Sequence, residues 1–228
     1  MRFAGQRAVK IAAVCMSVFM MGVGVSLLRL THFGTDPCSA MNYDISYLSG
    51  IPFGTCQLFY NAAALLLVTV FDGSYIGAGT FANMFLVGYT ADLFSIVWAK
   101  SGIPALPSLA VRLLLLAAGL AVFVLFAAVY ANSGQGLAPY DALADLLARS
   151  VGRLLHRRAD FKAVRIFYDG AHMLVGFLLG GEAGFVTLAM ALFLGPAIQG
   201  VGRLKKYFRG DGPAAAFRAR YGKLSHRL

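Results

Sequence analysis

The residues of this sequence best suited to chemistry are ionisable and amide side chains inside long apolar runs. Arg165, Asp169 and His172 lie four and three positions apart in one such run, and Gln57 and Asn61 lie four apart in another. An aspartate at the middle of a membrane span costs about 2.5–3.5 kcal/mol on insertion scales, so a partner or a ligand must offset that cost. The spacing predicts that each set shares one helix face, where it can bind a polar solute or a coupling proton.

Two interpretations of these residues stay open. In the first, Asn61 and Asp169 face each other across the interface between two halves of the chain and bind the solute or proton. In the second, Arg165 and Asp169 neutralise each other along one helix, and Arg165 extends to the membrane surface. The candidate binding residues of the whole chain are Asp36, Ser39, Asn42, Asn61, Asn83, Asp92, Asp141, Arg165, Asp169 and His172.

Asn83 and Asp92 share a third apolar run. We expect hydrogen bonds between helices from Asn83 and from Gln199, which occupies a sixth run after a Gly-Pro pair. Asp92 lies toward the outer end of its run, and an alternative role for it is a gate formed with Arg29 and Asp36.

Composition identifies the elements that must position these residues. The chain is 59% hydrophobic and 13% charged, whereas about a quarter of a soluble domain is charged. A membrane span needs about 20 apolar residues, and such runs cover 9–30, 54–71, 76–98, 109–131, 163–180 and 184–204. We therefore expect an integral membrane protein with about six transmembrane helices in a single membrane domain, 1–228.

An internal repeat relates the two halves. Residues 34, 37 and 40 recur at an offset of 102, the sequence FYN at 59–61 recurs as FYD at 167–169, and residues 77, 80 and 88 recur at 184, 187 and 195. Each half holds three spans, so the second half enters the membrane in the opposite sense. The sequence thus predicts an all-α fold of two inverted three-helix repeats, 9–98 and 109–204, followed by a basic cytoplasmic tail, 205–228. Many secondary transporters have this architecture.

Each repeat also contains a short helix interrupted by Gly and Pro. We expect Asp36 to be the N-cap and Pro37 the first residue of a helix over 37–48, ended by Gly50 and Pro52. The counterpart is expected over 139–155. Two placements stay open, because both helices can rest on the membrane surface or can enter it and line a cavity.

Basic residues set the orientation. The net charge is +10, and with a cytoplasmic N-terminus seventeen of the 20 basic residues lie in cytoplasmic segments. The positive-inside rule then predicts that both termini are cytoplasmic. Anionic lipid head groups are the expected partners of the basic loop and tail, and no nucleic acid is needed to explain them.

Several segments resemble a known family. The stretches FGTDPCSAMNYDIS, FGTCQLFYN, GAGTFANMFLVGYTADLF, GLAPYDAL and FLGPAIQG are similar to signature segments of the YczE/YyaS/YitT group of bacterial integral membrane proteins. The resemblance covers about 14–201 and implies a multi-pass protein of the bacterial plasma membrane, from a group with little settled biochemistry. GGEAGFVTL departs from the pattern, with Phe185-Val186 where the first half has Ala78-Gly79.

The sequence contains no nucleotide-binding GxxxxGK[ST], no HExxH, no GxSxG and no paired Cys and His ligands. We therefore expect no enzyme, no cofactor and no metal. The first functional hypothesis is a small transporter or substrate-binding membrane protein for a polar or amphipathic solute, working as a homodimer because six short helices enclose little volume. The alternative is a non-transporting accessory protein that recruits a cytoplasmic partner through its basic loop and tail.

Overall fold

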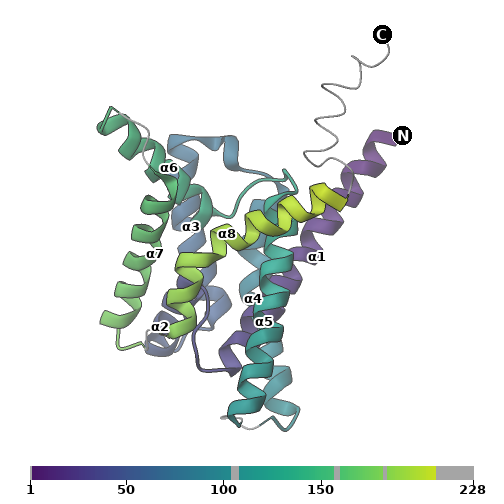
Figure 1. The fold of residues 1–228 in the computed structure, drawn as a ribbon, viewed down its shortest axis with the longest axis vertical. Coiled ribbons are helices and arrows are strands. Elements are labelled where there is room, and N and C mark those ends of the chain that lie inside the picture. The colour runs from purple at the N-terminus through teal and green to yellow at the C-terminus, as the bar shows by residue number, and fades with distance from the viewer. Residues whose placement is uncertain (1, 104–107, 157–159, 182–183, 209–228) are drawn as a thin grey trace, which may run out of the picture.

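The computed structural model describes residues 2–103, 108–156, 160–181 and 184–208, and every regular element among them is a helix (Figure 1). The elements are α1 (Arg2–Leu30), α2 (Pro37–Ser49), α3 (Phe53–Phe71), the short 3₁₀ helix η1 (Gly73–Tyr75), α4 (Ala78–Lys100), α5 (Leu109–Ala131), α6 (Pro139–Leu154), α7 (Phe161–Leu178) and α8 (Phe185–Phe208).

Four of the described helices are long and apolar enough to cross a bilayer, where the sequence had suggested six. They are Ala8–Leu30, Phe53–Phe71, Ala78–Lys100 and Leu109–Ala131. The fifth and sixth expected spans fall on α7 and α8. Polar residues such as Arg165 and Asp169 interrupt α7, and the described apolar part of α8 is the shorter segment Phe185–Ile198. The helices make this a membrane protein.

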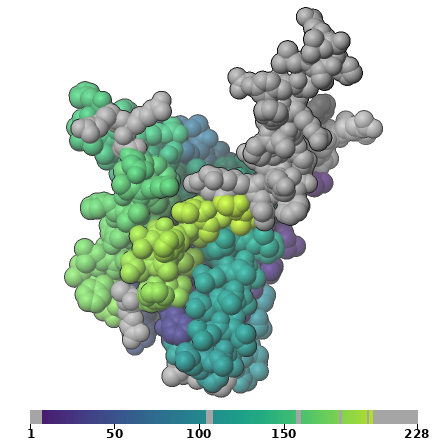
Figure 2. Space-filling model, viewed as in Figure 1, coloured from purple at the N-terminus to yellow at the C-terminus, as the bar shows by residue number. Residues whose placement is uncertain are grey.

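Helix α1 packs along both α4 and α5. Glycines permit this close approach, because a Cβ on Gly22 would lie 2.6 Å from the carbonyl oxygen of Val87 and one on Gly24 would lie 3.0 Å from Phe123. Helix α8 packs across α5 on the face shown in Figure 2. The main hydrophobic core therefore surrounds α1.

The two short helices begin in the interior and end at the surface. Asp36 caps α2 as expected, since its carboxylate accepts a hydrogen bond of 3.1 Å from the N–H of Ser39, and Gly50 ends the helix with φ of 69°. Helix α6 begins with Pro139 at its first turn. In both helices the first turns are buried and the last residues are exposed. Figure 1 places α6 near the upper end of α7 and α2 near its lower end, and both pack against α3 and α7.

The segments that precede α2 and α6 dock in matching ways. The carbonyl of Phe33 accepts a hydrogen bond of 2.9 Å from the N–H of Val186, and the carbonyl of Gln135 accepts one of 2.7 Å from the N–H of Gly79. The following glycines, Gly34 and Gly136, have φ of 107° and 98°. Each segment thus lies against the first turn of the last helix of the other half.

Salt bridges hold α6 to the turn between α3 and α4. Arg149 contacts Asp72 at 3.4 Å and Asp145 at 2.9 Å, and the hydroxyl of Tyr75 donates a hydrogen bond to Asp145. Hydrogen bonds from Ser74 lower the pKa of Asp72, and Arg149 adds to this effect. The basic tail at 205–228 lies outside the residues whose side chains are described, as do the basic residues at 157 and 158.

The docking segments yield a first prediction. Alanine at Gly34 or Gly136 must adopt a disfavoured backbone conformation, which costs about 1–3 kcal/mol. Its Cβ would also lie 2.2 Å from Thr187 Oγ1 or 2.6 Å from the nitrogen of Gly77. Both variants should lower the unfolding temperature of the detergent-solubilised protein. Gly170→Ala is the matched control, since nothing lies near its Cβ and alanine favours the helix. Equal unfolding temperatures for all three would contradict the docking.

Candidate functional site

A buried guanidinium lies where α6 meets α7. Arg165 Nη1 is 2.7 Å from Asp141 Oδ1 on α6, and Arg165 Nε is 3.0 Å from Asp169 Oδ1 on its own helix. The Arg165 side chain is 20% exposed and that of Asp169 is 5% exposed. A charge this far from water requires a partner of opposite sign. Here one cation serves two carboxylates.

Helix α6 supplies two neighbouring residues to this group from its first turn. The hydroxyl of Tyr140 donates a hydrogen bond of 2.5 Å to Asp169 Oδ1. The Arg165 guanidinium lies over the Tyr140 ring, 4.9 Å from its centroid. Because Pro139 begins the helix there, Tyr140 and Asp141 both reach α7 from its buried end.

A second hydrogen-bonded group joins α3 to α7. The hydroxyls of Tyr60 and Tyr168 are 3.0 Å apart, and the Tyr60 hydroxyl is 2.6 Å from His172 Nε2. The other ring nitrogen of His172, Nδ1, is 2.8 Å from the backbone carbonyl of Tyr168. Tyr60 and Tyr168 are the same position of the sequence repeat, at the offset of 108. Equivalent residues of the two halves therefore meet directly.

Helix α2 adds a third side to the site. Cys38 packs with Tyr140 and Tyr168 in one buried cluster. Asn42 Nδ2 donates to the carbonyl of Cys38 at 2.8 Å, which orients the amide and leaves Asn42 Oδ1 buried without a partner. The carboxylate of Asp36 lies within electrostatic range of Asp169 and Asp141. The first turns of α2 and α6 thus converge on the same region.

The structure corrects both interpretations of the pair on α7. Asn61 is not bonded to Asp169, because Asn61 Nδ2 donates to the carbonyl of Gln57 at 2.9 Å. The contact across the halves is made one position earlier, by the tyrosines. The ion pair of Arg165 with Asp169 is confirmed, but Arg165 stays buried and turns to Asp141 rather than extending to the membrane surface.

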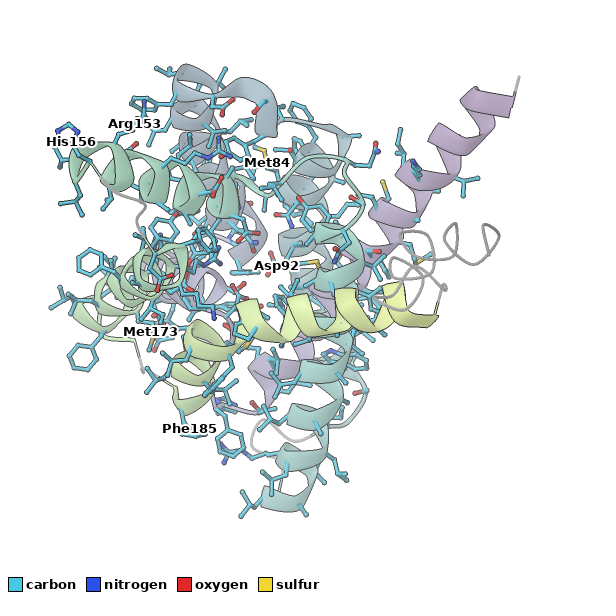
Figure 3. The ribbon with its side chains drawn as sticks, turned by 45° about the horizontal axis from the view of Figure 1, so that its top comes forward. Met84, Asp92, Arg153, His156, Met173 and Phe185 are labelled. Atoms are coloured by element: carbon cyan, nitrogen blue, oxygen red, sulfur yellow. The ribbon has the colours of Figure 1, made fainter. Side chains whose placement is uncertain are left out.

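Other expected contacts are not found among the described residues. Asn83 is buried on α4 and forms no hydrogen bond there with another described helix. The side chain of Gln199 lies outside the described residues, so its hydrogen bond stays a prediction. Asp92 accepts a hydrogen bond of 2.7 Å from the N–H of Gly54 and so serves the first turn of α3. Arg29 lies over the Tyr43 ring instead, 4.1 Å from its centroid, and forms no ion pair with Asp92 or Asp36 among the described residues. Figure 3 shows Asp92 inside the helices and Arg153 at the outer end of α6.

Sequence reasoning missed three tyrosines of the site, namely Tyr60, Tyr140 and Tyr168. A signal for two of them was present, because FYN and FYD are the repeated segments that contain Tyr60 and Tyr168. For Tyr140 the signal is its place directly after a helix-starting proline.

The site is rich in hydrogen-bond acceptors. Besides the carboxylates, the amide oxygen of Asn42 is buried and has no donor. The amide oxygens of Gln57 and Asn61 on α3 are also buried without a donor, but Gln57 Oε1 lies toward Gly88 of α4 and not in this site. The amide nitrogens of Asn42 and Asn61 face backbone carbonyls, which only accept, so their oxygens must point the other way. In the described part of the chain, no group of three or more His, Cys, Asp or Glu side chains is placed to hold a metal ion.

Comparison with known proteins identifies a family. The model of DUF6198, a family of unknown function, matches residues 8–203, so the chain belongs to that family. An uncharacterized protein of Haemophilus influenzae is 23% identical over 189 residues, which are 83% of this chain and 81% of that protein. No solved structure matches the chain.

The shared guanidinium yields a second prediction. Arg165→Gln leaves the buried carboxylate of Asp169 without its cation, and the 41% exposed Asp141 loses the same partner. This should lower the free energy of unfolding by about 3–5 kcal/mol, mostly through Asp169. Adding Asp169→Asn should recover part of this loss. Arg149→Gln removes a cation that is 57% exposed and should cost about 1 kcal/mol or less. Reversible unfolding in mixed micelles gives the free energy of unfolding of the wild type, the two single variants and the double variant. Equal losses for Arg165→Gln and Arg149→Gln would show that the buried group does not depend on its charge.

Proposed function

Starting from a family whose function is unknown, we propose that this protein binds, and moves across the membrane, a small polar or amphipathic solute. One observation carries the proposal, which is the buried Arg165 shared by Asp141 and Asp169 beside the Tyr60–Tyr168 contact. Ionisable groups inside a membrane protein are costly, and they commonly mark a substrate or ion pathway. The proposed binding residues are those of this group, with Asp36, Asn42 and His172 around them.

We also propose that the two halves are inverted repeats of three spans each, with α7 and α8 as the last two spans. Three features support this architecture. Residues equivalent in the repeat meet at Tyr60 and Tyr168, as residues near a two-fold axis must. Phe33 bonds to Val186 as Gln135 bonds to Gly79. Helices α2 and α6 have buried first turns and lie near opposite ends of α7 (Figure 1). Transporters built this way bind substrate at the repeat interface.

The orientation of the protein in the plasma membrane, with both termini cytoplasmic, rests on the positive-inside rule. On this proposal the outer end of α6, where Arg149 and Arg153 are exposed, lies at the cytoplasmic surface and contacts anionic head groups. The same proposal includes a homodimer, the absence of catalysis and kinship with the YczE/YyaS/YitT group. Each of these rests on the sequence arguments given above.

A ligand screen tests the proposed function. A solute that binds only the folded protein must raise its unfolding temperature, so we would measure thermal stabilisation of the purified protein by ions, small acids, amines and amphipathic metabolites. Stabilisation by a hit should disappear in Asp169→Asn. Asp160→Asn is the matched control on the same helix, because Asp160 is an exposed N-cap and asparagine caps equally well.

The outcomes separate the two functional classes. A hit that is lost in Asp169→Asn and kept in Asp160→Asn supports the transporter. A hit kept in both variants places its binding elsewhere and contradicts the proposed site. No hit across the panel contradicts the proposed function and favours the accessory protein, whose partner would then be sought on the basic loop and tail.

A further inference from the structure

The hydrogen bonds around His172 have a defined direction. The backbone carbonyl of Tyr168 can only accept, so the His172 nitrogen that faces it at 2.8 Å, Nδ1, must carry a hydrogen. In the neutral ring Nε2 is then a bare acceptor, and the Tyr60 hydroxyl donates to it at 2.6 Å. The Tyr60 oxygen in turn accepts from the Tyr168 hydroxyl at 3.0 Å. The three side chains form a relay that runs from Tyr168 through Tyr60 to His172.

The charges beside this relay do not balance. Arg165 contributes one positive charge, and Asp141 and Asp169 contribute two negative charges. Both carboxylates already accept hydrogen bonds from charged or hydroxyl donors. His172 Nε2 receives only the neutral Tyr60 hydroxyl. A proton that enters this group therefore has its free basic site on the imidazole.

The other proton acceptors near His172 among the described residues are the carboxylates of Asp141 and Asp169, which already bind Arg165, and in the case of Asp169 also Tyr140. Helix α8 brings no titratable side chain between Phe185 and Ile198. The titratable and charged groups that contact or act on His172 are Tyr60 on α3, Tyr140 on α6, and Arg165, Tyr168 and Asp169 on α7. The same group contains Asp141 on α6, which binds Arg165, and Asp36 and Cys38 on α2.

We infer that His172 Nε2 is a proton-binding site and that loading it reverses the relay between the two halves. The incoming proton forms an N–H bond at Nε2, which now donates to the Tyr60 oxygen. The Tyr60 hydrogen must then turn to the Tyr168 oxygen, and the Tyr168 hydroxyl must donate to a new acceptor. No other covalent bond changes, and the added charge neutralises the excess negative charge of Asp141 and Asp169.

This reversal would make a proton the ion coupled to solute movement. Only this coupling, and not proton binding itself, rests on the proposed function. Tyr60 belongs to the first half of the chain, whereas Tyr168 and His172 belong to the second. Proton loading therefore changes the hydrogen bond between Tyr60 and Tyr168, which are equivalent residues of the two halves. It also presents a new donor at Tyr168, beside the acceptors of the site.

Nuclear magnetic resonance of the full chain in lipid nanodiscs tests the inference without any solute. The protein would be labelled with ¹⁵N-histidine, and the signal of His172 would be assigned by its loss in His172→Gln, since the chain has 4 histidines. Neutral His172 should carry its hydrogen on Nδ1 and should become charged between about pH 5 and pH 8. Tyr60→Phe should change the proton affinity of His172 about threefold or more, the size expected for one hydrogen bond.

Tyr47→Phe is the matched control, because Tyr47 is 88% exposed on α2, and it should leave the titration in place. A hydrogen on Nε2 of the neutral ring, a His172 that stays neutral at pH 5, or an unchanged titration in Tyr60→Phe would each overturn the inference. If Tyr60→Phe does not fold, the position of the hydrogen on the neutral His172 ring of the wild-type protein still tests the inference by itself. A solute screen without hits would leave this result standing, so the two proposals fail separately.

Discussion

One buried cation organises the interior of this protein. Arg165 forms ion pairs with two carboxylates, one on its own helix and one on α6, and so connects α6 to α7. A buried ion pair is rarely worth more than well-packed apolar residues would be, but breaking it is expensive. The group therefore specifies which surfaces of α6 and α7 meet. The Tyr140 hydroxyl and ring complete the enclosure.

The second constraint is the cost of exposing backbone polar groups inside a membrane. Chain breaks before α2 and α6 free backbone donors and acceptors, and the structure satisfies them with partners from the opposite half. Those bonds require the chains to approach closely, which explains Gly34 and Gly136 with positive φ. The breaks also let each short helix begin in the interior, so that its first turn carries Asp36 or Asp141 to the same region.

Local features of the fold were predictable from the sequence. The Asp36 cap, Pro37 at the first turn and the end of α2 at Gly50 follow from short-range rules, as does the Arg165–Asp169 pair at i and i+4. The partner of Arg165 on α6 and the Tyr60–Tyr168 contact were not predictable, because they depend on how helices distant in the sequence pack. The repeat offset limited the choices to a pair of equivalent segments, but it did not specify which residue of FYN faces FYD. Asn61 was chosen for its polarity, whereas the helix face turned to α7 carries Tyr60.

The same packing argues that the polar group serves more than stability. A polar network across two halves is less stabilising than an apolar contact of equal area unless every group is satisfied, and Asn42 leaves a buried oxygen without a donor beside this group. An apolar interface would avoid this cost but would have nothing to exchange with an incoming donor. Arg165 already pairs with two carboxylates, so the group has an excess of negative charge and of hydrogen-bond acceptors. It is suited to a ligand that brings hydrogen-bond donors or positive charge, and a proton bound to His172 is the smallest ligand of this kind.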